Sequence, residues 1–421
     1  MAAWSNWSGS VSAAPTAIER PRTEAELSAI VARSRKVRVV GAGHSFMPLC
    51  ETDGTLLSLA DMEGEVEVSA DLSRASAPAG MSLAKLTETL WAKGASLINQ
   101  GDVNPQALAG ALATGTHGTG AALGSLSTAG RSFRLMMPDG SVVSCSAAEN
   151  PDLFQAQRLS LGLLGVATRI EFDVLPAYHL EERLETYRLD EVAARWEELA
   201  ANNRHVEFFI FPYSDIAMVK ILQPKPSEGD MREQADMDDR MFRRLCDLCT
   251  LLPILTPFVQ AKIIHANLRR RRVGPAYKIF PSDRTVKFEE MEYELPRANG
   301  WPALREVIAW IRKRRLPVTF PFEFRIVAAD DIWLSPFNRR IGASISMHQY
   351  ARMPFQALFV EAETIFRAHE GRPHWAKRHT LTEGEIHTLY PDAAKFCAVR
   401  ASVDPGAKFA NAHLAALFGA R

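Results

Sequence analysis

The sequence predicts an α+β fold made of more than one domain. The chain has 421 residues, beyond the roughly 100–200 residues of a typical single domain. Short strand-like runs of alternating polarity are mixed with segments of helical spacing, and in the second half this mixture is typical of an antiparallel sheet flanked by helices. A composition with 47% hydrophobic and 23% charged residues is ordinary for a globular protein, so a sizeable core is expected.

The beginning of the chain predicts a small α+β subdomain. A helix is expected over 17–36, because Thr23-Glu-Ala-Glu supplies a capping-type start and apolar residues follow at helical spacing. The β-branched run Val37-Arg-Val-Val then predicts a buried strand that ends in a glycine turn. Short strands are expected at 56–59 and 66–69.

Further elements are expected up to a boundary near residue 177. Residues 82–93 have the apolar face of an amphipathic helix, and Pro138-Asp-Gly between two β-branched runs predicts a hairpin. A strand at 170–174 ends at Pro176. We therefore divide the chain into domains at 1–176 and 177–421.

The second half supplies the elements of the antiparallel sheet. Helices are predicted at 190–201 and 302–315, and strands at 206–211 and 318–326.

Charge and cysteine content restrict the classes of function. Lys plus Arg and Asp plus Glu both number 49, so no positive field is present to attract nucleic acid. Five scattered cysteines indicate reduced thiols, and Cys246-x-x-Cys249 is interpreted as core because zinc needs about four ligands. No metal site is predicted. The N-terminus does not resemble a secretory signal, so a cytoplasmic location is expected.

One apolar segment allows two interpretations. Residues 245–264 are markedly apolar and precede Arg269-Arg-Arg-Arg, a combination typical of segments that lie on anionic membranes. Charged residues and prolines inside the segment argue against a spanning helix. We favour a buried helix pair with a solvated basic end, and peripheral membrane contact through 245–272 is the alternative.

Two glycine-rich segments predict a site for a phosphorylated ligand. Gly41 and Gly43 follow the predicted strand at 37–40, where backbone N–H groups suit a diphosphate. The dinucleotide fingerprint fails because position 46 is Phe. The segment 110–130 carries several glycines and threonine hydroxyls but almost no charge. Together the two loops could enclose one diphosphate.

Several ordered motifs match a known family. Val39 to Phe46, followed by the run from Gly101 to Gly120, resembles the FAD-binding domain of the vanillyl-alcohol-oxidase type. Glu323-Phe-Arg-Ile-Val, Arg372-Pro-His-Trp-Ala-Lys and Asp404-Pro-Gly-Ala-Lys-Phe-Ala-Asn are similar to segments of the sugar-1,4-lactone oxidases and the related alditol oxidases.

The resemblance implies a two-subdomain FAD-binding domain covered by a cap domain, with the flavin 8α carbon linked covalently to His44. The C-terminal segment is expected to pack back towards the flavin. Imidazole is a nucleophile suited to that role, although a histidine lying beside a noncovalent flavin would look the same in sequence. The cofactor-binding residues it implies are Val40, Gly41, Ala42, Gly43, His44, Ser45, Phe46, Gly110, Thr114, Gly115, Thr116, His117 and Val166.

Three charged residues are the predicted catalytic groups. Glu323 and Arg325 lie two apart on a predicted strand and so share one face. In general such a pair is more often an exposed ion pair. The resemblance instead implies that both contact substrate hydroxyls or the negative charge that develops on the flavin, and that Lys377 adds a second cation.

Asp102 and His348 are the additional substrate-binding residues that we predict. Asp102 could equally cap a turn, and His348 could be a core histidine. The alditol oxidases carry His-x-Thr on the strand of His348, which this sequence lacks. Gly101 matches a position over the flavin where a side chain could block oxygen, so we expect an oxidase that forms hydrogen peroxide.

The expected reaction is oxidation of an aldonolactone, such as L-gulono-, L-galactono- or D-arabinono-1,4-lactone, at its carbon 2 hydroxyl. The partners are then a small carbohydrate and molecular oxygen or another electron acceptor. An alditol oxidase acting on xylitol or sorbitol is the alternative. A flavin-binding subunit without catalysis is the alternative from another class, and the retained charged residues argue against it.

Overall fold

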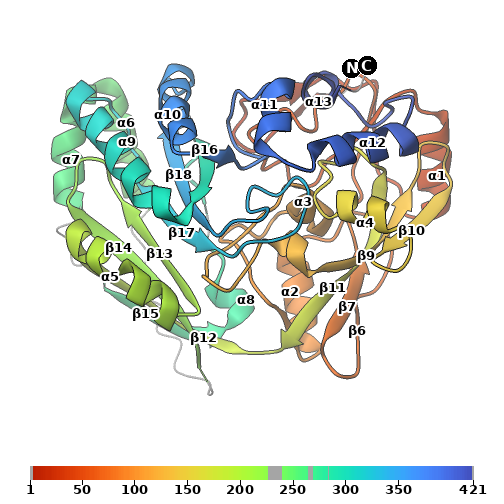
Figure 1. The fold of residues 1–421 in the computed structure, drawn as a ribbon, viewed down its shortest axis with the longest axis horizontal. Coiled ribbons are helices and arrows are strands. Elements are labelled where there is room, and N and C mark those ends of the chain that lie inside the picture. Colours follow the sequence, from red (N-terminus) through yellow and green to blue (C-terminus); the bar gives the residue numbers. More distant parts are fainter. Residues whose placement is uncertain (1–2, 226–238, 264–268, 283, 420–421) are drawn as a thin grey trace.

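The computed structural model describes residues 3–225, 239–263, 269–282 and 284–419. Two antiparallel sheets dominate the described part, one in each half of the chain (Figure 1). Strand β11 (Val166–Pro176) of the first sheet continues almost directly into β12 (His179–Arg188) of the second. The predicted α+β class is confirmed.

A small parallel sheet lies near the N-terminus. Its strands lie in the order β3 (Ala17–Glu19), β5 (Thr55–Leu57) and β4 (Val37–Val39). The helix α1 (Glu24–Arg33) connects β3 to β4. The prediction of a helix over 17–36 is wrong at both ends. Residues 17–19 pair with β5 instead, and Pro21 is placed where a helix interior would exclude it. A short hairpin of β1 (Trp4–Ser5) and β2 (Ser12–Ala13) precedes this sheet.

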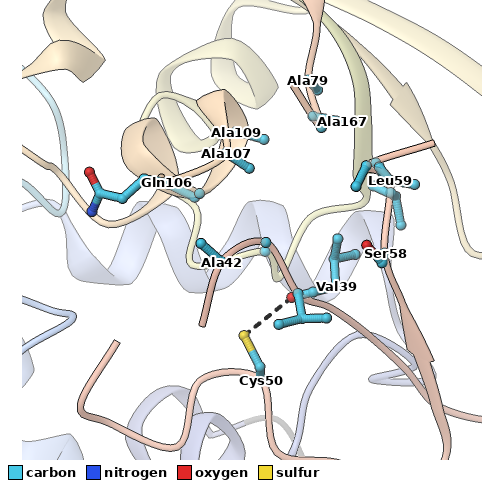
Figure 2. A pocket seen from close by; sticks show the side chains of 18 of the residues that line it. Val39, Ala42, Cys50, Ser58, Leu59, Ala79, Gln106, Ala107, Ala109 and Ala167 are labelled. Atoms are coloured by element: carbon cyan, nitrogen blue, oxygen red, sulfur yellow. Dashed lines mark hydrogen bonds between the residues drawn. The ribbon is translucent and has the colours of Figure 1, made fainter. Parts of the chain in front are cut away.

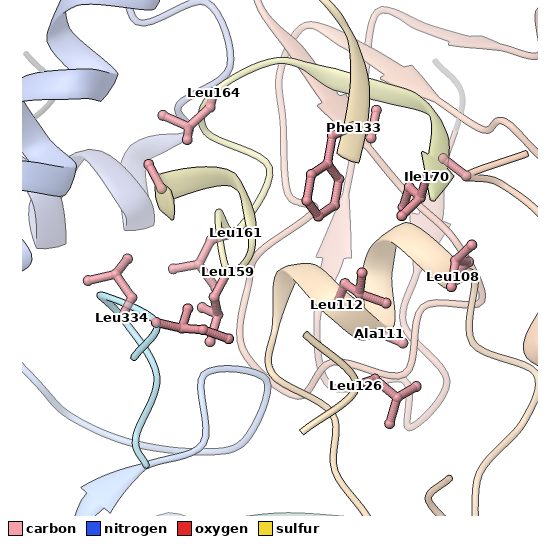
Figure 3. Packing of buried hydrophobic residues seen from close by; sticks show 14 of the residues in the cluster. Leu108, Ala111, Leu112, Leu126, Phe133, Leu159, Leu161, Leu164, Ile170 and Leu334 are labelled. Atoms are coloured by element: carbon pink, nitrogen blue, oxygen red, sulfur yellow. The ribbon is translucent and has the colours of Figure 1, made fainter. Parts of the chain in front are cut away.

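The first large sheet has the strand order β10-β9-β11-β7-β6, and β8 also pairs with β11. The predicted hairpin through Pro138-Asp-Gly is confirmed, because β9 and β10 pair across it and Gly140 has φ +85°. Buried Leu108, Leu112, Phe133 and Ile170 pack its face against neighbouring helices (Figure 3). The remaining elements here are β6 (Glu67–Val68), β7 (Arg74–Pro78), α2 (Leu83–Ala92), β8 (Ala95–Leu97), α3 (Leu108–Ala113), β9 (Gly130–Met136), β10 (Val142–Ser146) and α4 (Pro151–Gln157).

The second large sheet has eight antiparallel strands in the order β15-β12-β14-β13-β17-β18-β16-β19. The predicted antiparallel sheet is therefore confirmed. Its strands besides β12 are β13 (His205–Ile210), β14 (Ile216–Lys225), β15 (Arg270–Pro275), β16 (Phe288–Pro296), β17 (Phe322–Val327), β18 (Gly342–Tyr350) and β19 (Arg372–Pro373). Strand β17 begins later than the predicted 318, because Pro321 lacks the N–H that a ladder needs.

The two faces of this sheet differ in polarity. Phe208, Phe324 and Ile345 represent the apolar face, which packs on α5 (Leu189–Asn202), α9 (Gly300–Arg314) and α10 (Gln356–Ala368). Since alternate residues of a strand point to opposite faces, the other face receives the polar residues between them. Those include Glu207, Lys220, Glu290, Glu292, Glu294, Glu323, Arg325, Ser344, Ser346 and His348.

Helices α6 (Asp239–Leu251) and α7 (Thr256–Ile263) correct the prediction of a buried helix pair. Cys246 and Cys249 are buried as expected, but Leu251 is 79% exposed. The basic run does not end a helix, because Arg270 begins β15 and ion-pairs with Glu182. No helix in the described ranges is long and apolar enough to cross a membrane.

The C-terminal segment packs against the N-terminal subdomain (Figure 1). The Asn411 side chain donates to the carbonyls of Pro48 and Glu51, and the Lys408 ammonium donates to that of Val31. Its helices are α11 (Glu383–Leu389), α12 (Ala393–Val403) and α13 (Ala412–Phe418). The division into domains near residue 177 stays a prediction.

Candidate active site

The two predicted glycine-rich loops line one cavity of about 430 Å³. Figure 2 shows Val39 and Ala42 on one side of it, and Gln106 and Ala109 on another. Strand β4 ends at this cavity and the chain then turns through Gly43, whose φ is +69°. The lining of the cavity comes from the first half of the chain, from residues 38–50, 58–64, 78–85, 105–114 and 157–167.

The residues of this cavity fit a large polar ligand such as FAD. A Cβ on Gly41 would lie 2.9 Å from the Cβ of Ala107, so the two loops approach as closely as glycine allows. A Cβ on Gly110 would meet nothing within 4 Å, which leaves its backbone bare. The side-chain oxygens of Gln106 and Gln157 are buried without a partner and belong to residues of the lining. Such oxygens are available to ligand hydroxyl or amino groups.

A second, smaller cavity of about 100 Å³ adjoins the first, and both are lined by His44 and Gln106. Its residues come from both halves of the chain, including the polar face of the eight-stranded sheet. They are Trp7, His44, Phe46, Gly101, Asp102, Val103, Gln106, Thr116, His117, Arg284, Phe288, Glu290, Glu292, Glu323, Arg325, His348, His374, Ala376 and Lys377.

His44 lies where the two cavities meet. Its ring stacks on Trp7 with centroids 5.3 Å apart, and the backbone N–H of the neighbouring residue Phe46 donates to the Ala376 carbonyl. Burial and the Lys377 ammonium lower the pKa of His44 to about 4. The imidazole is therefore neutral at pH 7 and retains a free lone pair.

Arg325 is the central cation of the second cavity. Its guanidinium donates to Glu292 at 2.5 Å and to the Ser346 hydroxyl at 3.1 Å, and it lies 3.6 Å from Glu323. Burial opposes its charge, but Glu292 and Glu323 raise the Arg325 pKa above its ordinary value. The predicted pair Glu323 and Arg325 is thus buried in the cavity wall and is not a solvent-exposed ion pair.

Lys377 supplies the second cation. Its ammonium donates to Glu290, lies 3.9 Å from Glu292 and stands 5.3 Å from the centroid of the Phe46 ring. Burial alone would raise the pKa of Glu290, but Lys377 and His348 lower it to about 2. Lys377 is therefore held as an ion pair beside the loop that carries His44.

Asp102 is held by two cations at the edge of the cavity. It accepts from Lys220 at 3.1 Å and from Arg284 at 2.9 Å. Lys220 also pairs with Glu207 at 2.9 Å. Burial raises the pKa of Glu207 above its ordinary value, against the attraction of Lys220. The role predicted for Asp102, direct contact with substrate, stays a prediction.

Carboxylate oxygens of Asp102, Glu207 and Glu323 lie within 4.8 Å of one another, as do ligand atoms of His117, Glu292 and His374. In each of these two groups of potential metal ligands, a cationic side chain of the protein already pairs with a carboxylate. Lys220 neutralises the first, and Arg325 pairs with Glu292 in the second.

His117 belongs to the second cavity rather than to the first. Its Nε2 lies 3.2 Å from both Glu292 and Glu294. Burial opposes protonation, but these carboxylates raise the pKa of His117 to about 9, so the ring is cationic at neutral pH. His374, 5.7 Å away between ring centroids, has its pKa lowered to about 3 by burial.

The other predicted residues divide between the two cavities. His348 lines the second one and lies 3.3 Å from Glu290. A Cβ on Gly101 would lie 3.0 Å from the His117 carbonyl, so close backbone packing also favours glycine there. Gly115 lines neither cavity. The first cavity contains Val40, Gly41, Ala42, Gly43, His44, Ser45, Gly110, Thr114 and Val166, and the second contains His44, Phe46, Thr116 and His117.

Family models match both halves of the chain. The FAD binding domain model matches residues 15–146 and the D-arabinono-1,4-lactone oxidase model matches residues 170–417. The second match covers more than half of the chain. This protein belongs to the D-arabinono-1,4-lactone oxidase family. It is accordingly an FAD-dependent oxidoreductase that acts on CH–OH donors of the lactone class.

Relatives in this family span the whole chain. An L-gulono-1,4-lactone dehydrogenase of Mycobacterium tuberculosis is 36% identical, with 99% of both chains covered. The L-gulonolactone oxidase of Scyliorhinus torazame and the alditol oxidase of a Streptomyces species are each 30% identical, over 98% and 97% of this chain and 97% of each relative. Lactone oxidases, a lactone dehydrogenase and an alditol oxidase are thus similar to this family member.

A solved structure supports the fold. A solvent-stable cholesterol oxidase superposes with a TM-score of 0.84 at 17% identity, covering 99% of this chain and 97% of the other. At this level of identity the likeness concerns architecture alone, and it extends over both large sheets.

Sequence reasoning missed several residues of the second cavity. Glu290 and Glu292, which neutralise the two cations, lie on β16, where Phe288-Glu-Glu-Met-Glu-Tyr-Glu alternates acidic with apolar residues. That alternation was the available signal for a strand with one polar face. Trp7 and Lys220 had no local signal, because only tertiary contacts bring them to the site.

Proposed function

We propose that this family member oxidises the carbon 2 hydroxyl of an aldonolactone such as L-gulono-, L-galactono- or D-arabinono-1,4-lactone. The observation that carries the proposal is a small polar cavity with Glu323, Arg325 and Lys377 in its wall, adjoining the cavity that fits FAD. Bound FAD supplies the hydride acceptor for such a reaction.

The charged residues have complementary roles in this proposal. The Glu323 carboxylate accepts the proton of the carbon 2 hydroxyl, while Arg325 and Lys377 would stabilise the negative charge that the hydride brings to the flavin. Ion pairing with Glu292 and Glu290 fixes both cations before substrate arrives, so they need no reorganisation during the reaction. His348 and Asp102 orient further hydroxyl groups of the sugar.

A comparison of substrates tests the substrate class. Turnover with L-gulono-1,4-lactone and with xylitol is measured side by side, and kcat/KM at least tenfold higher for the lactone is expected. The 30% identical alditol oxidase makes the polyol the second candidate. Preference for xylitol would reverse the assignment.

We also propose that His44 is the covalent attachment point of the flavin, at the 8α carbon. His44 lies at the junction of the two cavities and its imidazole is neutral. In-gel fluorescence after SDS denaturation is expected to follow the polypeptide in the wild type but not in His44→Ala. Fluorescence that leaves the wild-type chain would exclude the bond.

For the electron acceptor we propose molecular oxygen, with hydrogen peroxide as product. Gly101 lines the second cavity and places no side chain there. The dehydrogenase relative provides the contrast. Stopped-flow reoxidation by oxygen and by a dye acceptor separates the two types of enzyme: fast reaction with the dye and negligible reaction with oxygen would make this protein a dehydrogenase.

A further inference from the structure

The turn between α6 and α7 presents an unusual group of exposed apolar side chains. Ten large hydrophobic residues are exposed in the described ranges, and five of them lie within 248–258. Leu251, Ile254 and Phe258 are 79%, 75% and 66% exposed, and Leu248 and Leu252 complete the group. We call these five residues the hairpin tip. The other five exposed residues are spread along the sequence, which needs no special explanation.

The helical hairpin that carries this tip is anchored to the eight-stranded sheet and the segments next to it. Phe242 and Cys246 of α6 are buried in a cluster with Phe320 and Tyr350. The side chain of Gln260 on α7 accepts from the Tyr213 backbone at 3.1 Å and donates to the Val318 carbonyl at 2.5 Å. The tip is therefore presented on a fixed support, and its exposure is a property of the fold.

Two exposed basic side chains lie on the helices behind the tip, and the acidic Asp247 between Arg244 and Leu248 is paired with Arg352. Arg244 is exposed seven residues before Leu251, and Lys262 is exposed four residues after Phe258. At about 1.5 Å per residue these spacings correspond to roughly 10 Å and 6 Å along the helices. That separation matches the distance between the acyl boundary and the headgroup layer, into which interfacial segments insert about 5–10 Å.

We propose that the hairpin tip docks this protein onto the surface of an anionic lipid bilayer. The five apolar side chains enter the acyl boundary, while Arg244 and Lys262 lie at the level of the lipid phosphates. The charge arrangement favours lipid over a protein partner. A stable protein interface uses about 20–30 residues a side, many more than the tip offers.

Vesicle flotation of the full-length, FAD-loaded protein tests this proposal. Vesicles of phosphatidylcholine with about 30% phosphatidylglycerol are compared with vesicles of phosphatidylcholine alone, at ~0.1 M salt. The protein is expected to bind the anionic vesicles. Its partition coefficient is expected to be several-fold lower for vesicles without phosphatidylglycerol. The variant Leu251→Ser/Ile254→Ser/Phe258→Ser is expected to lower the partition coefficient at least about tenfold.

Two further variants make the result specific. In Arg244→Gln/Lys262→Gln, the ratio of binding to anionic over neutral vesicles is expected to fall several-fold. Ile341→Ser/Val360→Ser removes exposed apolar side chains elsewhere and is expected to bind as the wild type does. Turnover and FAD content report folding in every case, and the single variant Leu251→Ser replaces the triple variant if the latter fails to fold.

The proposal is overturned if the wild type does not float with anionic vesicles, or if the tip variant floats equally well. Tip-dependent self-association in sedimentation experiments, without vesicle binding, would instead assign the tip to contact between copies of the chain. Vesicle binding and self-association do not depend on which substrate is oxidised, so failure here leaves the proposed reaction untouched.

Discussion

Arg325 and Lys377 differ in how many charges their removal would leave unpaired in the second cavity. Arg325 pairs with two buried carboxylates, Glu292 and Glu323, so its removal affects both of them. Glu290 is also buried, but His348 remains near it when Lys377 is removed. Removing one partner of a buried pair leaves an uncompensated charge and is strongly destabilising. Lys377 is therefore the better residue for separating catalysis from stability.

Lys377→Ala is expected to slow flavin reduction by the lactone by about 10²–10³-fold, the usual effect of losing one preorganised electrostatic group. Single-turnover absorbance of the flavin measures this rate. Lys395→Ala, at an exposed lysine that lines neither cavity, is the control and should leave the rate unchanged. An unchanged rate in Lys377→Ala would exclude Lys377 from the catalytic groups, and a wild type whose flavin is not reduced by the lactone would indicate a flavin-binding subunit without catalysis of its own.

His117 couples stability to pH. Its pKa is about 9 in the folded protein and about 6.5 in an unfolded chain, so its ion pair stabilises fully below pH ~6.5 and is lost as pH rises towards 9. The difference in Tm between the wild type and His117→Gln is therefore expected to be largest near pH 6 and to shrink by pH 9. Thermal unfolding across this range measures it.

His374 provides the matched control for that experiment. Burial lowers its pKa to about 3, so the ring is neutral throughout pH 7–9. The Tm difference between the wild type and His374→Gln should stay constant over pH 7–9. A constant difference in His117→Gln as well would show that the His117 ring carries no pH-dependent stabilisation.

At the scale of elements, the eight-stranded sheet separates packing from chemistry. On β17, Phe322, Phe324 and Ile326 pack under the helices, while Glu323 and Arg325 face the cavity. Period-two alternation makes both assignments in a single strand. The active-site residues are thus positioned by the core residues next to them.

Phe324→Ala is expected to lower the free energy of unfolding by about 3–5 kcal/mol, because Phe324 is fully buried and contacts Phe208, Trp196 and Trp301. Denaturant unfolding followed by circular dichroism measures the loss. Val360→Ala, half exposed on α10, should cost under about 1 kcal/mol. A similar cost for both variants would contradict the assignment of Phe324 to the core.

At the scale of the whole molecule, distant segments close around the loop that follows His44. Phe46 donates to the Ala376 carbonyl, Trp7 stacks on His44, and Asn411 bonds the carbonyls of Pro48 and Glu51. Both ends of the chain therefore support the loop that connects the two cavities.

Asn411→Ala is expected to lower the free energy of unfolding by about 1–3 kcal/mol, since buried carbonyls lose their donor. It should also increase amide hydrogen exchange in residues 46–51. Asn203→Ala, which removes a bond to the Leu199 carbonyl at a helix end, is the control and should leave that exchange unchanged. Unaltered exchange at 46–51 in Asn411→Ala would show that the Asn411 hydrogen bonds do not hold this loop in place.

The features that depend on local pattern could be predicted from the amino-acid sequence. Glycine spacing marked the loops of the first cavity, and alternation placed Glu323 and Arg325 on one strand face. These features need only neighbouring residues and period-two geometry. The family was also readable from ordered motifs, because cofactor-binding loops and charged strands tolerate few residue types.

Tertiary structure alone decided the features that depend on long-range contacts. Residues 17–19 form a strand because β5 is available to pair with them, against their helical pattern. Lys220 reaches Asp102 across 118 positions of sequence. The hairpin tip stays exposed because α6 and α7 bury their other faces. Burial and pairing are properties of the assembled fold, and apolar spacing along the chain does not reveal which apolar face finds a partner.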